Sequence, residues 1–243
     1  IKFLVIKTSF LNSSQVLKII TTTKTLKKKF YKDYFVKSKK IFVLHNASSL
    51  KFKFQKTIKN KKKINLGYFG SIYLSRGVRL FLEISKNDKI NNYYLYGGSN
   101  EEIQTIRKQY PNKNLILNPY RPYSQIQKSI KKIDIALLPY TSKITVAGNV
   151  GDISNYTSPL KIFDFMQAGK LILCSDINVI REILTNNHNS ILIKKFKNLS
   201  TWINKISHIS KSFKKYDKLR LNAYKYANKH NVDWRAKKIL QFK

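Results

Sequence analysis

The stretch from Ser158 to Lys170 contains the residue types and spacing that point most directly to chemistry in this sequence. Ser158 favours the N-cap of a helix, and Pro159 suits the first helical position, where a missing backbone N–H costs nothing. The unpaired N–H groups at such a helix start face one point and attract an anion. Asp164 follows within two turns, where a carboxylate can accept hydrogen bonds from two ribose hydroxyls. The stretch therefore indicates a site for a phosphate and a ribose.

The same residues also have a simpler interpretation. An amphipathic helix that turns Leu160, Phe163 and Met166 toward a core and ends near Gly169 would explain them without any ligand. The order of the features around this helix favours the binding site, because further residues suited to a ligand follow the preceding strands.

A glycine-rich turn follows the first of these strands. Gly70 and Ser71 close the run Gly67–Ser71, and Arg76 stands at the opening of the next predicted helix. Glycine lets the backbone approach a ligand closely, and an arginine can donate two parallel hydrogen bonds to a diphosphate. Turns of this kind are also common in proteins that bind nothing there.

Two further turns continue the pattern. Gly97 and Gly98 follow the second strand, at positions where a larger side chain would obstruct a sugar or a phosphate. After the third strand, the loop Asn118–Tyr123 places Arg121 between aromatic rings that could flank a nucleobase. A tight turn and a proline-stiffened loop are the alternatives. After the fourth strand, the polar loop Thr141–Thr157 could close over the site.

Strand and helix patterns alternate along most of the chain. The expected strands are Ile64–Phe69, Tyr93–Tyr96, Leu115–Leu117, Ile133–Leu138, Leu171–Cys174 and Ile191–Ile193. The expected helices between them are Leu74–Ser85, Glu101–Gln109, Tyr123–Lys132, Pro159–Gln167 and Val179–Leu184. This alternation predicts an α/β fold with a Rossmann-like, doubly wound parallel sheet, whose ligands bind at the carboxyl ends of the strands.

Composition narrows the class of protein. The 243 residues carry a formal net charge of +36, but the lysines are spread along the whole chain and accompany abundant Ile and Asn. We therefore attribute most of the charge to compositional bias and expect no nucleic acid as partner. An anionic membrane surface stays a candidate partner, because it attracts each well-placed Lys or Arg by about 1 kcal/mol.

Other features concern the compartment. A single cysteine, Cys174, excludes an internal disulfide framework and fits a reducing compartment. No apolar run approaches the roughly 20 residues of a membrane-spanning helix, and a chain that starts at Ile1 shows no recognisable signal peptide. We expect a fragment of a soluble, cytoplasmic protein. A peripheral position at the inner face of the membrane is compatible with this expectation.

The ordered series of motifs resembles the C-terminal half of GT-B glycosyltransferases of the family 4 type. The resemblance lies in Gly67–Gly70 with Arg76-Gly77, Tyr96–Gly98, Asp134–Tyr140, Ser158–Met166, and Ser175-Asp176 with Arg181-Glu182. It implies that residues 1–50 are a remnant of the N-terminal Rossmann domain with the hinge, and that residues 51–63 are a connector. It also implies a nucleotide-sugar-binding domain over residues 64–225 and a terminal crossing helix over residues 226–243.

The resemblance assigns roles to individual residues. Arg76 would contact the donor diphosphate, together with the backbone amides of Ser158, Pro159 and Leu160 and the side chain of Lys161. Asp164 would bind the ribose. Two positions depart from the family pattern: Tyr156 occupies the place of the first of two paired acids, and Ser71 the place of a second basic residue.

The activity implied by the resemblance is transfer of a sugar from a nucleotide diphosphate sugar to an acceptor hydroxyl, with retention of configuration. The acceptor would be a glycan or a lipid-linked molecule in surface polysaccharide or lipopolysaccharide synthesis, and this fragment would be inactive alone. Catalysis would depend on Arg76 and Asp164, with no cofactor. We also expect no metal, because the four histidines lack ligand spacing.

Two other functions remain open on the sequence. A non-catalytic module that binds nucleic acid or acidic lipid would account for the charge. An epimerase of the same double-Rossmann plan would act on a nucleotide sugar without an acceptor and release a free sugar.

Overall fold

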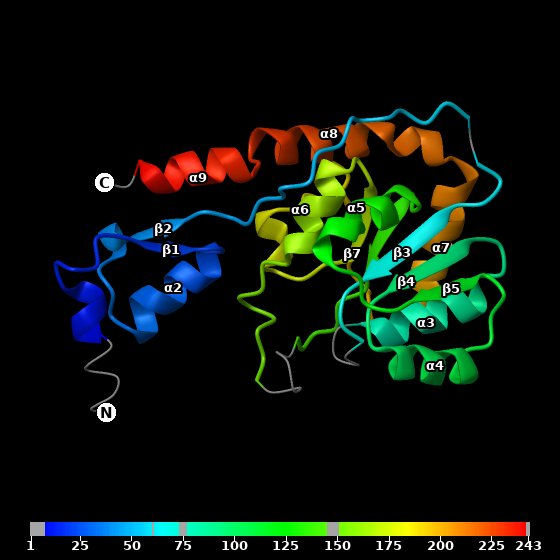
Figure 1. Cartoon of the computed structure of the whole chain (residues 1–243), viewed down its shortest axis with the longest axis horizontal. Helices are drawn as coiled ribbons and strands as arrows, with labels where there is room; N and C mark the ends of the chain where they lie inside the picture. Colours follow the sequence, from blue (N-terminus) through cyan, green and yellow to red (C-terminus); the bar gives the residue numbers. More distant parts are fainter. Residues whose placement is uncertain (1–7, 60, 73–76, 145–150, 242–243) are drawn as a thin grey trace.

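The structure, a computed structural model, describes residues 8–59, 61–72, 77–144 and 151–241. Arg76 and the start of the predicted helix Leu74–Ser85 lie outside the described residues. The chain forms a larger α/β domain and a smaller N-terminal unit (residues 8–43), joined by a connecting segment (residues 44–63) (Figure 1).

The larger domain is built on one sheet of six parallel strands. The strands are β3 (Asn65–Phe69), β4 (Asn92–Tyr96), β5 (Leu115–Asn118), β6 (Ile135–Leu138), β7 (Leu171–Ser175) and β8 (Ile191–Ile193), in the spatial order β5-β4-β3-β6-β7-β8. From β3, the chain adds β4 and then β5 on one side. It then returns to the other side of β3 and adds β6, β7 and β8 in turn. This is the strand order of dinucleotide-binding folds, in which ligands bind where the direction reverses. The predicted doubly wound α/β fold is confirmed.

Helices cover both faces of this sheet. On one face lie α3 (Val78–Asn87), α4 (Asn100–Gln109) and α7 (Leu199–Lys211), and on the other α5 (Tyr123–Lys131), α6 (Leu160–Gln167) and α8 (Asp217–Lys229). Successive residues of a strand point to opposite faces. In β6, Ile135 and Leu137 accordingly pack with the first group of helices, and Ala136 and Leu138 with the second.

Two predicted helices differ from the structure. Helix α3 begins at Val78, because Gly77 adopts a left-handed φ of 83° that cannot continue a right-handed helix. The prediction of a helix over Val179–Leu184 was wrong: only the 3₁₀ turn η4 (Ile180–Glu182) forms there. The polar turn from Thr185 to Ser190 follows at once and leaves too little length for an α-helix.

The N-terminal unit is small. It contains β1 (Ile19–Thr21) and β2 (Ile41–Val43), which pair in parallel, helix α2 (Lys24–Asp33) and the 3₁₀ turn η1 (Ser38–Lys40). The last helix, α9 (Val232–Leu240), extends from the larger domain over this unit, and the Arg235 Nε donates a hydrogen bond to the His45 carbonyl at 3.0 Å (Figure 1). The expected boundary between residues 225 and 226 falls within α8.

The described part of the connecting segment contains no helix or strand, and hydrogen bonds attach it to α8. The backbone N–H and the hydroxyl of Thr57 donate to the two carboxylate oxygens of Asp217, each at 2.8 Å. Arg220 donates to the Thr57 hydroxyl and to the Gln55 carbonyl. These bonds fix the path by which the chain enters β3.

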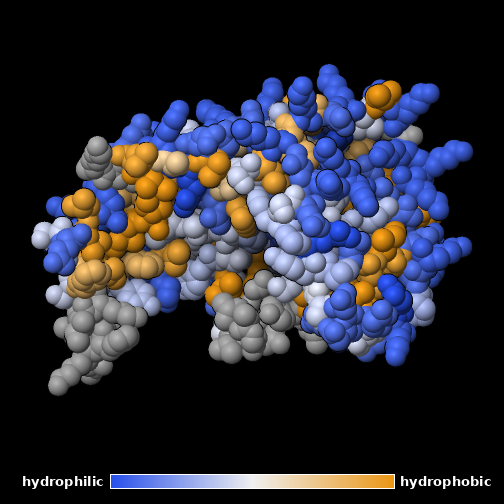
Figure 2. Space-filling model, viewed as in Figure 1, coloured by the Kyte–Doolittle hydropathy of each residue, from blue (hydrophilic) through white to orange (hydrophobic). Residues whose placement is uncertain are grey.

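Surface polarity differs between the two parts of the molecule. In the face shown in Figure 2, hydrophilic side chains dominate the larger domain, whereas apolar ones gather over the N-terminal unit and α9. Leu17, Phe35 and Leu240 are exposed large hydrophobic residues of this region. No helix within the described residues has both the length and the apolar character needed to cross a bilayer.

Glu182 ties the larger domain to the N-terminal unit. Its carboxylate accepts hydrogen bonds from the backbone N–H groups of Lys24, at 2.6 Å, and Thr25, at 3.2 Å. These are the first two residues of α2, where N–H groups lack partners inside the helix and the helix dipole favours negative charge.

Glu182→Ala should therefore loosen α2 selectively. Loss of a carboxylate at a helix start costs about 1 kcal/mol, so amide hydrogen exchange in α2 should accelerate about fivefold, while β3 and β6 keep their protection. Glu101→Ala, which removes an exposed carboxylate from the first turn of α4, is the matched control. Equal exchange rates for α2 in both variants would contradict the assigned role of Glu182.

Candidate functional site

A cavity of about 300 Å³ lies at the carboxyl ends of β3, β4 and β5, against the start of α6. We call it the first cavity. Of the residues predicted to bind a donor, it brings together Gly70, Ser71, Gly97, Gly98, Arg121, Leu160, Lys161 and Asp164. These residues come from four separate stretches of sequence. Their convergence is what the strand order requires of a ligand site in this fold.

The glycine turns let two strand ends come close together. A Cβ atom on Gly97 would lie 1.9 Å from the Gly70 carbonyl oxygen, and Gly97 and Gly98 have φ values of 152° and 77°. The Gly70 N–H donates to the Tyr96 carbonyl at 2.9 Å, which extends the pairing of β3 and β4 into the turns. Glycine is thus required at Gly97 by the backbone itself, and it also leaves one wall of the cavity without side chains.

Lys161 places a positive charge at the end of β3. Its Nζ donates to the Phe69 carbonyl at 2.9 Å and lies over the rings of Tyr68 and Tyr140, 5.1 and 5.4 Å from their centroids. The same Nζ is 3.2 Å from the position that a Cβ on Gly70 would take. The ammonium group is therefore held beside the glycine turn at the wall of the first cavity.

Asp164 is a buried carboxylate in the wall of the first cavity, 5% exposed. Its Oδ1 accepts hydrogen bonds from the Ser48 hydroxyl at 2.6 Å and from the Tyr123 hydroxyl at 2.9 Å. Burial raises the pKa of this carboxyl group, and the two hydrogen bonds oppose the rise. Sequence reasoning missed Ser48, because it lies 116 residues away in the connecting segment and no local pattern links the two.

The start of α6 differs in detail from the prediction. The helix begins at Leu160 with Pro159 at the N-cap, and no side chain caps it, so the assignment of Ser158 as N-cap was wrong. The Ser158 hydroxyl is buried without a hydrogen-bond partner, and the Ser158 carbonyl accepts from the Asn46 amide at 2.6 Å. Packing against the connecting segment outweighs the intrinsic capping preference of serine. Neither Ser158 nor Pro159 lines the first cavity.

Aromatic rings form much of the remaining wall. Phe69, Tyr96 and Phe165 lie toward the core, where the rings of Phe69 and Tyr96 stack with centroids 4.6 Å apart, and Tyr120 and Tyr123 lie toward solvent. The Nε of Arg121 is buried without a hydrogen-bond partner at this wall. Sequence reasoning named the loop that contains Arg121 but missed the inner rings, because their strand and helix faces become known only with the sheet register.

Three predictions about chemistry, which concern Arg76, metal binding and Cys174, are not tested by the structure. Arg76, expected to bind the diphosphate, lies outside the described residues. Within the described ranges, no three His, Cys, Asp or Glu side chains gather in a way that could hold a metal ion. Cys174 is a free, fully buried thiol whose pKa is raised by burial.

Comparison with known proteins places the chain in a family. Residues 50–226 match the family described as glycosyl transferases group 1, so the chain belongs to that family. No curated protein matches the sequence.

Solved structures show the same fold. TarM, whose structure from S. aureus is also known with UDP, has a TM-score of 0.71 at 15% identity, and the match covers 99% of this chain and 45% of TarM. HepE from Anabaena, solved with UDP-glucose, has a TM-score of 0.71 at 13% identity over 99% of this chain and 66% of HepE. Sucrose-phosphate synthase from Thermosynechococcus elongatus has a TM-score of 0.72 at 12% identity over 99% and 60%.

These comparisons define how far the resemblance extends. The predicted GT-B glycosyltransferase fold is confirmed. The chain spans about half to two thirds of the length of the structures it matches. Membership of the family 4 type stays a prediction.

Replacing Gly97 tests whether the backbone contact holds the first cavity in shape. Gly97→Ala should lower the free energy of unfolding by about 2 kcal/mol or more, because the new methyl group meets the Gly70 carbonyl oxygen. Gly151→Ala is the control, because Gly151 also has a positive φ but its Cβ would meet no atom within 4 Å. Chemical denaturation of both variants measures the difference. Equal destabilisation would show that conformation alone, without the contact, accounts for the glycine at position 97.

The charged carboxylate of Asp164 should lower the stability of the folded protein at neutral pH. Its pKa in the folded state is raised, so the folded protein binds this proton more tightly than the unfolded chain and the charged form is disfavoured at neutral pH. Asp164→Asn should therefore unfold at the same or a higher temperature than the original protein at pH 7, and its advantage should shrink as the pH falls toward 4. A lower melting temperature for the variant at pH 7 would contradict this.

Proposed function

We propose that this chain forms the donor-binding half of an enzyme that transfers a sugar from a nucleotide diphosphate sugar to an acceptor hydroxyl. One observation supports this most: the first cavity gathers glycine turns, an ammonium group and a buried carboxylate where a Rossmann-like sheet binds its ligand. Membership of the group 1 glycosyl transferases supports the same activity. The first cavity, at about 300 Å³, falls at the lower end of the size range of small-molecule sites.

The residues of the first cavity suit the charge that such a reaction creates. When the glycosidic bond breaks, negative charge grows on the leaving diphosphate. Lys161 and the backbone N–H groups at the start of α6 would donate to it, together with Arg76 as the resemblance implies. One such preorganised donor can lower the barrier by about 3 kcal/mol. We propose that no metal or other cofactor takes part.

Asp164 and the aromatic wall would hold the nucleoside. The carboxylate would accept hydrogen bonds from the ribose hydroxyls, and Tyr120, 74% exposed, offers a ring face for a nucleobase. Structures of HepE with UDP-glucose and of TarM with UDP concern proteins of the same fold. They support a uridine nucleotide as the first donor to test.

The finer parts of the proposal depend on the resemblance and on charge. We propose transfer with retention of configuration, to a glycan or lipid-linked acceptor in surface polysaccharide or lipopolysaccharide synthesis. We also propose a cytoplasmic protein that associates peripherally with an anionic membrane surface, which the net charge of +36 supports.

Binding of nucleotides tests the proposal directly. UDP and GDP should be titrated into the protein by calorimetry, and one of them should bind saturably. Asp164→Ala and Lys161→Met should each weaken that binding about 10- to 100-fold, because each removes a charged hydrogen-bonding group worth about 1.5–3 kcal/mol. Arg76→Ala should act in the same direction. Lys108→Met, at an exposed position on α4, is the control and should bind like the original protein.

Other outcomes would separate the alternatives. Steeply salt-dependent binding of an oligonucleotide, unaffected by Asp164→Ala, would replace the transferase by a polyanion-binding module. Release of free sugar from a nucleotide sugar without any acceptor would favour the epimerase.

A further inference from the structure

A second cavity opens at the opposite end of the sheet, where the strands begin. It has a volume of about 410 Å³ and lies between the connecting segment, α5 and α8. We call it the basic cavity, because its charged lining residues are Lys51, Lys53, Lys131, Lys170 and Arg220. Among the described residues that line it, none is acidic. A concave surface lined by one sign of charge concentrates the field and attracts the opposite charge.

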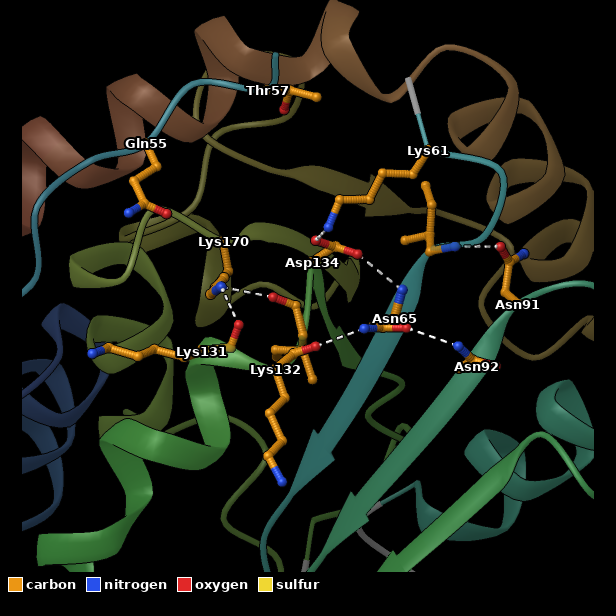
Figure 3. Close-up of polar contacts among 12 residues, drawn as sticks. Gln55, Thr57, Lys61, Asn65, Asn91, Asn92, Lys131, Lys132, Asp134 and Lys170 are labelled. Atoms are coloured by element: carbon orange, nitrogen blue, oxygen red, sulfur yellow. Dashed lines mark hydrogen bonds and ion pairs between the residues drawn. The ribbon is translucent and has the colours of Figure 1, made fainter. Parts of the chain in front are cut away.

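Two of these cations are fixed in the wall of the basic cavity. Arg220 is 9% exposed, and its guanidinium donates to the Gly169 carbonyl at 2.8 Å, to the Gln55 carbonyl at 3.0 Å and to Asp217. The Lys170 ammonium donates to the Ile133 carbonyl at 2.6 Å, at the junction between the end of α5 and the start of β6 (Figure 3). A group held in place in this way loses little entropy when it binds a ligand.

The three other lysines of the basic cavity are exposed at its rim. Lys51 and Lys53 come from the connecting segment, and Lys131 from the last residue of α5. Gln127, which also lines the cavity, donates to the Lys51 carbonyl at 2.8 Å and holds the segment against α5. The basic cavity thus combines exposed charges at its rim with two that are fixed in its wall.

The nearby carboxylates do not neutralise Lys170. Asp134 accepts from the Lys61 ammonium at 2.6 Å and from the Asn65 backbone N–H at 3.0 Å (Figure 3). Asp217 pairs with Arg220. Of the ion pairs in the described part of the chain, none includes Lys170. The pKa of Lys170 is lowered to about 8, mainly by burial; the charge of Asp134 opposes this, and the charges of Arg220 and Lys61 add to it.

We propose that the basic cavity binds a phosphate-bearing anion. Lys170 belongs to none of the ion pairs described above, and a phosphate or diphosphate group would supply the negative charge for one. Such a group also accepts several charge-assisted hydrogen bonds at once. Lys170 and Arg220 bind the group at the inner wall, and Lys51, Lys53 and Lys131 enclose it. The same chemistry is present in a soluble phosphate compound and in the headgroup of an acidic phospholipid. The site is separate from the first cavity and does not depend on the donor that is proposed there.

The test uses inorganic pyrophosphate and lipid vesicles as probes, with the original chain, Lys170→Met and the double variant Lys51→Gln/Lys53→Gln. Calorimetry at constant ionic strength measures pyrophosphate binding. Cosedimentation measures binding to phosphatidylcholine vesicles with and without phosphatidylglycerol. Lys108→Gln/Lys113→Gln removes two exposed lysines elsewhere and matches the loss of charge. Lys161→Met reports on pyrophosphate bound in the first cavity.

The expected result is at least a tenfold loss of binding in both basic-cavity variants and a change of less than twofold in Lys108→Gln/Lys113→Gln, whereas any loss in Lys161→Met belongs to pyrophosphate bound in the first cavity. If the loss concerns pyrophosphate, the ligand is a soluble phosphate compound; if it concerns only phosphatidylglycerol vesicles, the ligand is a lipid headgroup. Equal losses in the double variant and its charge-matched control, or a loss of pyrophosphate binding confined to Lys161→Met, would overturn the proposal. The double variant changes only exposed side chains, so it decides the matter even if Lys170→Met fails to fold.

Discussion

The burial of Asp164 is the constraint around which the rest of the first cavity is arranged. A carboxylate that is 5% exposed needs donors, and it finds them in Ser48 of the connecting segment and Tyr123 at the start of α5. Three elements that are distant in sequence are thereby fixed to one another beside the glycine turns. The packing of two apolar layers on the sheet supplies the free energy that offsets the cost of burying this charge.

The parallel strands explain why the first cavity and the basic cavity lie at opposite ends of the domain. At the carboxyl ends, strand termini and the start of α6 surround the first cavity with glycine backbone, Lys161 and Asp164. At the amino ends, polar side chains such as Asp134 and Asn65 close the sheet, and lysines gather because the helices return there. One domain therefore presents two surfaces of different chemistry that share only the core between them.

Sequence alone predicted the parts of this structure that depend on local pattern. The alternation of apolar residues located all six strands of the sheet, and the glycines at positions 70, 97 and 98 marked the turns that line the first cavity. What it could not predict depends on distant contacts. The hydrogen bond from Ser48 to Asp164 joins residues whose nearness follows only from the path of the connecting segment, and contact with Asn46 accompanies the shift of the α6 N-cap from Ser158 to Pro159. The basic cavity could not be predicted either, because the connecting segment, α5 and α8 that line it come together only in the packed chain.

Two of the contacts that hold the connecting segment are those of Ser48 with Asp164 and of Thr57 with Asp217 of α8. Between them lie eight residues of irregular chain, and before them stands β2 of the N-terminal unit. A rotation of that unit would pull on the segment between β2 and Ser48, and a displacement of Ser48 would change the hydrogen bonding of the carboxylate in the first cavity. If the rotation changes the free energy with which a ligand binds at Asp164, binding of that ligand must change the free energy of the rotation by the same amount.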